Sequence, residues 1–427
     1  MFSISLGMEE YIMTLGIVAS FVGMIATMLL SRKEIKGMLV NMGLSRRVLL
    51  GAIAIAIVFL GIEMALVKPT QQLFFDDSIY QGMALHLLRT GQAWFCDYGT
   101  PFNCTVGEIF HEPIGESFNL AMGFALGGVS RVAAYNTQIA LAMIAVLMTF
   151  FVSLLVFKNR TVALFSELFM AVSPIMLIWG APTTSDMPAL TYALIALFAV
   201  LVFMHKKSAG TFGFALFALV LSTYMKVNSL LLLPVFLIVY LILDDKGIAS
   251  SIKSNIRLVK QNVLNTKVLM LLLLSLLLLA PEVGYTVSQL DTGYGYSGTY
   301  MQLTCSPNLP AIHPNASISL QNFNANICAN LNFWFNYYKT GYIIQPLLYT
   351  LIAIFGGLVM IFKGKTRELA AIGIWFIAFF LLYTAFYAGG VNYGVDWRFM
   401  LSVIAQASML AGFGAASIYG LGDLFGR

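Results

Sequence analysis

Residues 133–157, AAYNTQIALAMIAVLMTFFVSLLVF, decide the fold class of this chain. They include no charged side chain and exceed the roughly 20 apolar residues that a helix needs to cross a bilayer. Helix is the expected element because in lipid it satisfies every backbone hydrogen-bonding group within the segment. Mainly apolar stretches recur at 11–30, 48–67, 161–179, 186–204, 210–225, 228–243, 268–286, 343–362, 368–387 and 399–420. The sequence therefore predicts an all-α polytopic membrane protein with about 11 transmembrane helices.

The composition of the 427 residues agrees with this class. Hydrophobic residues make up 59% and charged residues 10%, with a mean hydropathy of +0.85, which excludes an ordinary soluble domain. The first apolar stretch does not resemble a cleavable signal peptide, because the acidic Glu9 and Glu10 precede it instead of a basic region. No basic stripe with interleaved aromatic residues is present, so nucleic acid is not an expected partner.

The lysines and arginines predict the orientation in the membrane. Most of the 24 cluster in segments that this topology places on one side: 32–47, 158–160, 206–207, 246–267 and 363–367. Short basic loops mark the cytoplasmic side of a membrane protein. We therefore expect a multi-pass protein of the plasma membrane with its N-terminus outside and its C-terminus in the cytoplasm. The net charge of +5 then reflects the orientation in the membrane and is no evidence for binding of nucleic acid.

The apolar stretch from 114 to 130 is predicted not to cross the membrane. If it crossed, the basic segments 158–160 and 206–207 would lie outside, against the charge rule. We expect instead helices at the outer interface, within an external loop of residues 68–132. A second external loop is predicted at 287–342. The chain then divides into an extra N-terminal helix with a basic loop (1–47), a membrane module with the first external loop (48–243) and C-terminal helices with the second (244–427).

All four cysteines fall in the two external loops: Cys96, Cys104, Cys305 and Cys328. On an oxidising face they predict two disulfides, and short closures favour pairing within each loop over the two other pairings. Free buried thiols are the alternative. Two sequons in the same loops, at Asn103 and Asn315, are weak signals for glycosylation.

Ionisable residues gather at the external ends of the predicted helices. Asp76 and Asp77 precede an amphipathic run, residues 79–88, which predicts a short surface helix ended by Gly91. Other external segments carry further ionisable residues: His111 and Glu112, Asp186, Lys226, and Arg398. An active site at the membrane surface requires such a convergence of ionisable groups at one depth.

Each of these residues also has an ordinary structural interpretation. Lys226 and Arg398 stand where cations commonly snorkel from helix ends to the interface. Asp186 precedes an apolar helix, which aspartate often caps, and Asp76 and Asp77 precede the amphipathic run in the same way. The sequence leaves both interpretations open at these positions.

The order of the motifs resembles that of the GT-C glycosyltransferases, which include the protein O-mannosyltransferases and the lipid A aminoarabinose transferases. The matching segments are Asp76-Asp77-x-x-Tyr80 with Gly91, His111-Glu112-Pro113, Thr184-Ser185-Asp186, Lys226 with Leu230 to Pro234, and Arg398-Phe399-Met400-Leu401. The chain departs from the family pattern at Glu112, where the family carries a lysine. It also lacks the Trp-Trp-Asp-Tyr-Gly motif of oligosaccharyltransferases.

This resemblance implies a glycosyltransferase with a sugar donor linked to polyprenyl or dolichyl phosphate. The acceptor would be a protein, lipid or glycan on the extracytoplasmic face, and the transfer would invert the anomeric centre. The resemblance assigns Asp76 as the base, with Asp77 and Asp186 as further catalytic carboxylates. It assigns Lys226 and Arg398 to the donor phosphate.

A divalent cation is a further expectation at this site. His111, Glu112 and Tyr80 are the candidates for orienting the acceptor or holding the ion. Oxygen ligands favour magnesium or manganese, whereas His111 would also allow zinc.

Two other functions are weighed against the enzyme. A secondary transporter would show paired inverted repeats and charges near the membrane midplane. The sequence shows no such repeat, and its polar residues gather at one surface. A non-catalytic membrane assembly protein would tolerate replacement of Asp76 and Asp77.

Overall fold

The computed structural model describes residues 6–65, 74–96, 104–105, 113–243, 266–291, 301–303, 310–312, 347–385, 398 and 400–425. Four predicted residues of interest lie outside these ranges: His111, Glu112, Cys305 and Cys328.

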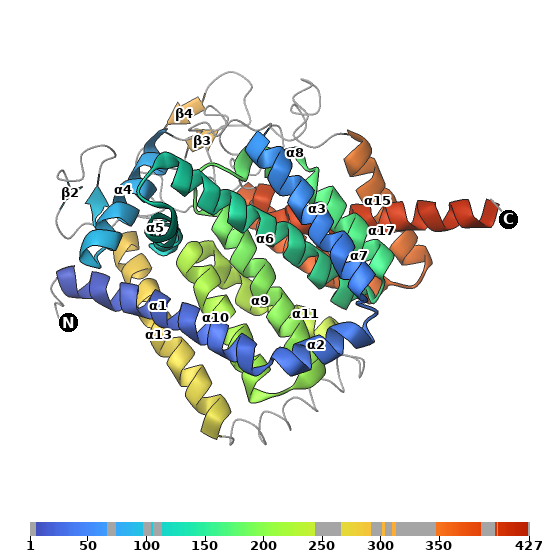
Figure 1. Cartoon of the computed structure of the whole chain (residues 1–427), viewed down its shortest axis with the longest axis horizontal. Helices are drawn as coiled ribbons and strands as arrows, with labels where there is room; N and C mark the ends of the chain where they lie inside the picture. Colours follow the sequence, from blue (N-terminus) through green and yellow to red (C-terminus); the bar gives the residue numbers. More distant parts are fainter. Residues whose placement is uncertain are drawn as a thin grey trace.

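The described chain is almost entirely helical, as predicted (Figure 1). The N-terminal half contains α1 (Leu6–Leu30), α2 (Arg32–Asn41), α3 (Arg46–Ala65), α4 (Phe74–Thr90), α5 (Gly115–Gly127), α6 (Arg131–Phe157), α7 (Arg160–Ala171), α8 (Pro174–Trp179) and α9 (Asp186–Lys206). The C-terminal half contains α10 (Ala209–Met225), the 3-10 helix η1 (Val227–Leu231), α11 (Leu232–Leu243), α13 (Thr266–Asp291), α15 (Leu347–Phe362), α16 (Thr366–Ala385) and α17 (Leu401–Phe425).

Five of the described helices are long and apolar enough to cross a bilayer: α1, α3, α6, α9 and α17. Shorter apolar helices occupy 209–225, 227–243, 269–285 and 348–362. This pattern confirms a multi-pass membrane protein, while the count of 11 crossings stays a prediction. The helix α5 has 13 residues and spans about 20 Å, which is too short for the roughly 30 Å hydrocarbon core.

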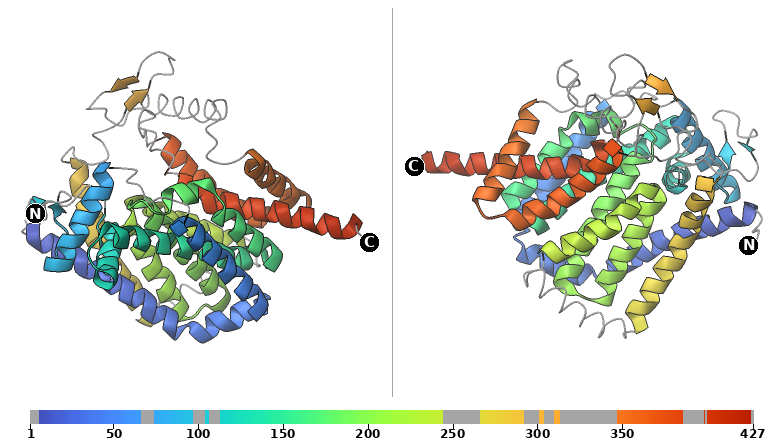
Figure 2. Two further views of the ribbon diagram at one scale, coloured as in Figure 1. Left: turned by 45° about the horizontal axis from the view of Figure 1, so that its top comes forward. Right: turned by 180° about the vertical axis from the view of Figure 1, so that it is seen from behind.

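The centre of the molecule is α9, which is the most buried of the five long helices. It packs between α6 and α10, and α10 in turn packs against α1 and α13. On the other side, α17 packs on both α7 and α15, and its C-terminal end extends beyond the bundle (Figure 2). The backbones of α15 and α17 approach closely at Gly356 and Gly414, where an added Cβ would overlap a carbonyl oxygen of the other helix.

Two predicted crossings are interrupted near the same end of the bundle. The stretch 161–179 was predicted as one helix, but it divides into α7 and α8 at Pro174, which has no N–H to continue a helix. The stretch 228–243 begins as the 3-10 helix η1, because Lys226 has an extended backbone (φ −157°, ψ 127°) that ends α10. These breaks turn the chain sharply beside the start of α9, where Asp186 lies.

The described residues include two short antiparallel strand pairs. In the first, β1 (Phe95–Cys96) pairs with β2 (Cys104–Thr105), so that Cys96 stands opposite Cys104. Cys96 is disulfide-bonded, and this register supports the predicted pairing within the first external loop. The second pair joins β3 (Met301–Leu303) to β4 (Pro310–Ile312). In Figure 1, β3 and β4 lie above the helices, whereas β2 lies at the left, beside α4.

Candidate active site

The two adjacent aspartates lie in the first turn of α4, one turn earlier than the helix predicted over 79–88. Gly91 follows the helix with φ +77°, as its predicted role at the helix end requires. Successive residues of a helix point about 100° apart, so Asp76 and Asp77 face different surroundings. Asp77 lies on the buried face of α4, whereas the side chain of Asp76 is 21% exposed.

Asp77 ties α4 to the turn that precedes α9. Its Oδ1 accepts hydrogen bonds from the backbone N–H and from the hydroxyl of Thr183, both at 2.6 Å. Gln81, one helical turn further, donates to the same hydroxyl at 3.0 Å. Tyr80 is only 1% exposed and belongs to the core beneath this contact. These hydrogen bonds from α4 hold the 181–186 turn in place, so Asp77 acts by positioning this turn.

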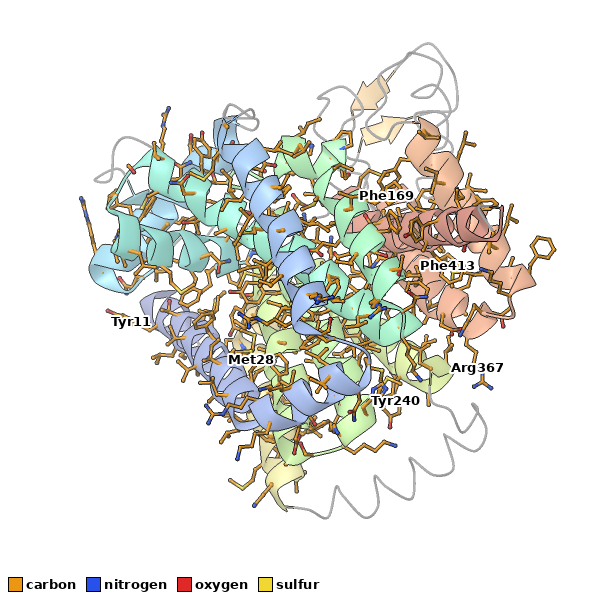
Figure 3. All side chains as sticks on the ribbon, turned by 45° about the vertical axis from the view of Figure 1, so that its right-hand side comes forward. Tyr11, Met28, Phe169, Tyr240, Arg367 and Phe413 are labelled. Carbon is orange, nitrogen blue, oxygen red and sulfur yellow. The ribbon has the colours of Figure 1, made fainter. Side chains whose placement is uncertain are left out.

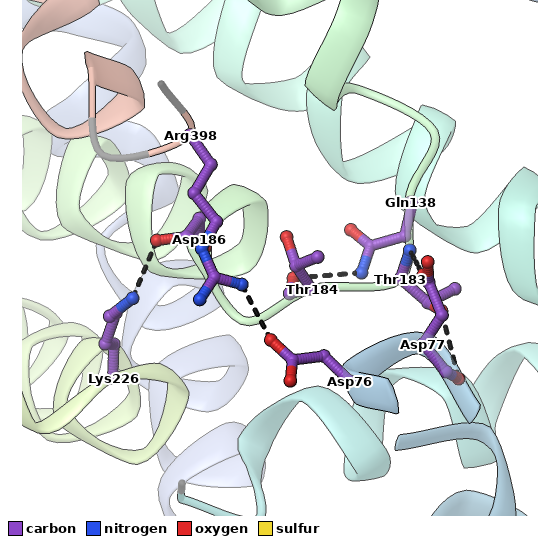
Figure 4. A network of polar contacts seen from close by, with 8 residues as sticks. All are labelled: Asp76, Asp77, Gln138, Thr183, Thr184, Asp186, Lys226 and Arg398. Carbon is purple, nitrogen blue, oxygen red and sulfur yellow. Dashed lines mark hydrogen bonds and ion pairs between the residues drawn. The ribbon is translucent and has the colours of Figure 1, made fainter. Parts of the chain in front are cut away.

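Four charged residues from distant segments meet beside this turn (Figure 4). Lys226 Nζ lies 2.7 Å from Asp186 Oδ1, and Arg398 NH1 lies 2.7 Å from Asp76 Oδ2. Arg398 Nε lies 3.5 Å from the second oxygen of Asp186. The structure thus brings together Asp76, Asp186, Lys226 and Arg398, which the sequence placed on separate external turns. We refer to these four residues as the ion-pair cluster.

The cluster is partly accessible at one end and closed at the other. The Asp186 and Lys226 side chains are 4% and 3% exposed, whereas those of Arg398 and Asp76 are 15% and 21% exposed. Asp186 also begins α9, where the positive end of the helix dipole favours an anion. Two cations and two carboxylates balance in charge, and the pair that solvent reaches is Arg398 with Asp76.

A narrow pocket extends from Asp186 and Lys226 into the bundle. Its walls include Leu190 of α9 and the aromatic residues Trp375 and Phe379 of α16. Asn228, Ser229 and Ser402 also line the pocket, so its walls are mixed in polarity. Its volume of about 20 Å³ has room for about one water molecule.

Sequence reasoning missed Glu116, which lies in the first turn of α5 and is fully buried. The side-chain amide of Gln138 donates to its Oε1, and the same amide lies 3.3 Å from the carbonyl oxygen of Thr184. Burial raises the pKa of Glu116 well above its usual range, and the nearby charges of Asp77 and Asp186 act in the same direction. A carboxyl inside an otherwise apolar interfacial stretch is the sequence signal that would have identified it.

The described residues do not form a metal site by themselves. No group of three histidine, cysteine or acidic side chains with suitable geometry occurs in the part of the chain that the structure describes. The two carboxylates of the ion-pair cluster, Asp76 and Asp186, both face Arg398. Because His111 and Glu112 lie outside the described ranges, the predicted divalent cation stays a prediction.

A family model described as dolichyl-phosphate-mannose-protein mannosyltransferase matches residues 111–283, which include Glu116, Asp186 and Lys226. Among solved structures, ArnT from Cupriavidus metallidurans in the apo state matches with 15% identity and a TM-score of 0.51. The match covers 86% of this chain and 59% of ArnT. ArnT bound to undecaprenyl phosphate matches with 14% identity and a TM-score of 0.51, over 87% of this chain and 61% of that one. No curated protein matches the sequence significantly.

These findings define the chain as a polytopic membrane protein with the fold of ArnT. The predicted resemblance to the GT-C class is thereby confirmed, with the mannosyltransferase family match lying in the segment that holds much of the site. The chain spans about 59% of the length of ArnT.

Proposed function

We propose that this protein is a membrane glycosyltransferase that takes a sugar from a polyprenyl-phosphate-linked donor and transfers it to an acceptor outside the cytoplasm. The observation that carries the proposal is the ion-pair cluster, in which a partly exposed carboxylate and two cations from distant segments meet. The mannosyltransferase family match and the undecaprenyl phosphate bound to ArnT support the same donor class.

The two cations of the cluster are the groups suited to the donor phosphate. Arg398 has a planar guanidinium that can contact two phosphate oxygens at once, and Lys226 supplies a point charge at one end of the pocket. Trp375 and Phe379 line the same pocket, which would have to widen for the first isoprenoid units of the donor to lie against them. In this arrangement Asp186 keeps both cations in place, since it lies within 3.5 Å of each.

Asp76 is the group suited to act as the base. The acceptor hydroxyl attacks the anomeric carbon, its proton passes to the Asp76 carboxylate, and the bond from the anomeric carbon to the phosphate oxygen breaks. The electron pair of that bond leaves with polyprenyl phosphate, whose charge Arg398 and Lys226 stabilise. A single displacement inverts the anomeric centre.

Arg398 is proposed to leave Asp76 for the donor phosphate, which makes Asp76 available as the base. Without donor, Arg398 holds the Asp76 carboxylate at 2.7 Å. When the donor phosphate takes over the guanidinium, Asp76 is released to accept a proton. Asp77, which is buried against Thr183, positions the neighbouring turn, and His111 and Glu112 are proposed to orient the acceptor.

The test is release of polyprenyl phosphate from a panel of lipid-phosphate sugars by membranes with matched protein levels. We expect Asp76→Asn to reduce turnover by about 10²- to 10⁴-fold, the usual contribution of a general base. The control is Glu34→Gln, which removes a carboxylate whose partner is Ser208, far from the site in the fold. Turnover by Asp76→Asn equal to that of wild type would show that the cluster is not the catalytic site.

A further inference from the structure

A second cavity lies at the end of the bundle opposite the ion-pair cluster. Its volume is about 470 Å³, and it is bounded by the turn between α6 and α7, the ends of α9 and α11, and the turn between α15 and α16. The 21 residues of α9 run from Asp186 at the cluster to the cavity wall and span about 30 Å. The two sites therefore lie near opposite faces of a bilayer.

The rim of this cavity is basic. Four of its lining residues are lysines or arginines: Lys158, Lys363, Lys365 and Arg367. Its lining also includes one carboxylate, Glu368, which is ion-paired to Lys365 at 2.9 Å. Among the described residues, Lys158, Lys363 and Arg367 have no carboxylate within ion-pair distance. Three positive charges thus surround the opening, and Figure 3 shows Arg367 at the edge of the molecule.

The apolar surface next to this cavity is the end of α15. It presents Ile361 and Phe362, which are 52% and 87% exposed, as expected for side chains that face lipid. The apolar residues of the cavity lining itself, such as Leu155 and Leu201, are buried in the bundle. A basic cavity next to a lipid-facing helix end suits a phosphate group attached to acyl chains better than a free anion.

Helix ends offer a competing explanation for part of this charge. The helices α6, α9 and α15 end near the cavity, and cations commonly stabilise the negative ends of helix dipoles. Lys158 directly follows α6 and Lys363 directly follows α15, so helix ends account for both. Arg367, however, lies in the first turn of α16, where a cation is unfavourable to the dipole. Helix stabilisation therefore does not account for all three charges.

We propose that this cavity binds the phosphate headgroup of an anionic phospholipid, with its acyl chains along the lipid-facing end of α15, at the face opposite the ion-pair cluster. Basic pockets between transmembrane helices are suited to such headgroups, with each Lys or Arg contributing to the attraction. The proposal is independent of the glycosyl-transfer chemistry, since none of its residues belongs to the ion-pair cluster.

The experiment uses the full chain in detergent, with native mass spectrometry to compare retained phosphatidylglycerol and phosphatidylcholine with identical acyl chains. The test variant combines Lys158→Asn, Lys363→Gln and Arg367→Gln. Asparagine is chosen at 158 because the residue has φ +52°, a conformation that asparagine tolerates. The matched control, Lys33→Gln with Lys36→Gln and Arg46→Gln, removes three exposed cations on or next to α2, outside the cavity.

We expect wild type and the control to prefer phosphatidylglycerol, and the test variant to lose roughly 10- to 100-fold of that preference. Melting temperatures would be measured alongside, so that a loss of preference is credited only to a folded variant. If the folded variant keeps the wild-type preference, the proposal is wrong. Competition by inorganic phosphate at concentrations equal to the lipid would assign the site to a free anion and overturn the lipid assignment.

Discussion

At the scale of single residues, Glu116 is the group whose protonation should be visible in stability. Its raised pKa means that the folded protein keeps a proton that the unfolded chain releases above the ordinary pKa of about 4.5. In that range the folded state binds more protons, so stability falls as pH rises, by at most about 1.4 kcal/mol per pH unit. Glu116→Gln keeps the shape and remains neutral. We expect its melting temperature to be less sensitive to pH between 5 and 8 than that of wild type.

Glu116 is connected to the ion-pair cluster through its neighbours. Glu116 contacts Gln138, whose amide reaches the carbonyl of Thr184 beside Asp77 and Asp186, so it acts on the site through its neighbours. Parallel melting curves for wild type and Glu116→Gln at every pH would contradict a buried proton at this position.

At the scale of elements, the start of α5 is packed directly against the end of α10. A Cβ added at Gly115 would overlap the carbonyl oxygen of Tyr224 and the sulfur of Met225, immediately before Lys226. We expect Gly115→Ala to destabilise the protein by about 1–3 kcal/mol and to lower turnover by displacing Lys226 and Glu116. Gly61→Ala is the matched control, since Gly61 lies in α3 with nothing within 4 Å of an added Cβ. Equal melting temperatures and turnover for Gly115→Ala and wild type would show that the two helix ends can separate freely.

The sequence predicted most of the helices and the break at Lys226 between 210–225 and 228–243, but not the division of 161–179. Long apolar stretches such as 133–157 set the helices, because lipid leaves the backbone no other partner. The division at Pro174 and the 3-10 helix η1 depend on how α8 and η1 pack around the start of α9, which periodicity does not encode. The sequence showed which helix ends carry charged residues of the site. The pairing of Asp76 with Arg398 and the burial of Asp77 and Glu116 depend on tertiary packing, which the sequence pattern does not show.

At the scale of the whole molecule, we expect the two ends of the bundle to face different compartments, with the ion-pair cluster outside the cytoplasm. Val129, just after α5, is 53% exposed, and Lys206, at the end of α9, is also exposed. We expect Val129→Cys to react with a membrane-impermeant maleimide in intact cells, and Lys206→Cys to react only after permeabilisation. Maleimide labelling of the wild-type protein measures the background from the native cysteines. The opposite pattern would invert the predicted orientation and place the ion-pair cluster on the cytoplasmic side.

The central claim is that the ion-pair cluster binds the phosphate of a lipid-linked sugar. The most direct measurement is an experimental structure of the full chain with polyprenyl phosphate, with Lys226→Ala as the comparison for binding. We expect phosphate density in contact with both Lys226 and Arg398, the isoprenoid chain beside Trp375 and Phe379, and Asp76 released from Arg398. Phosphate density away from these two cations, with the Arg398–Asp76 pair intact, would contradict this claim.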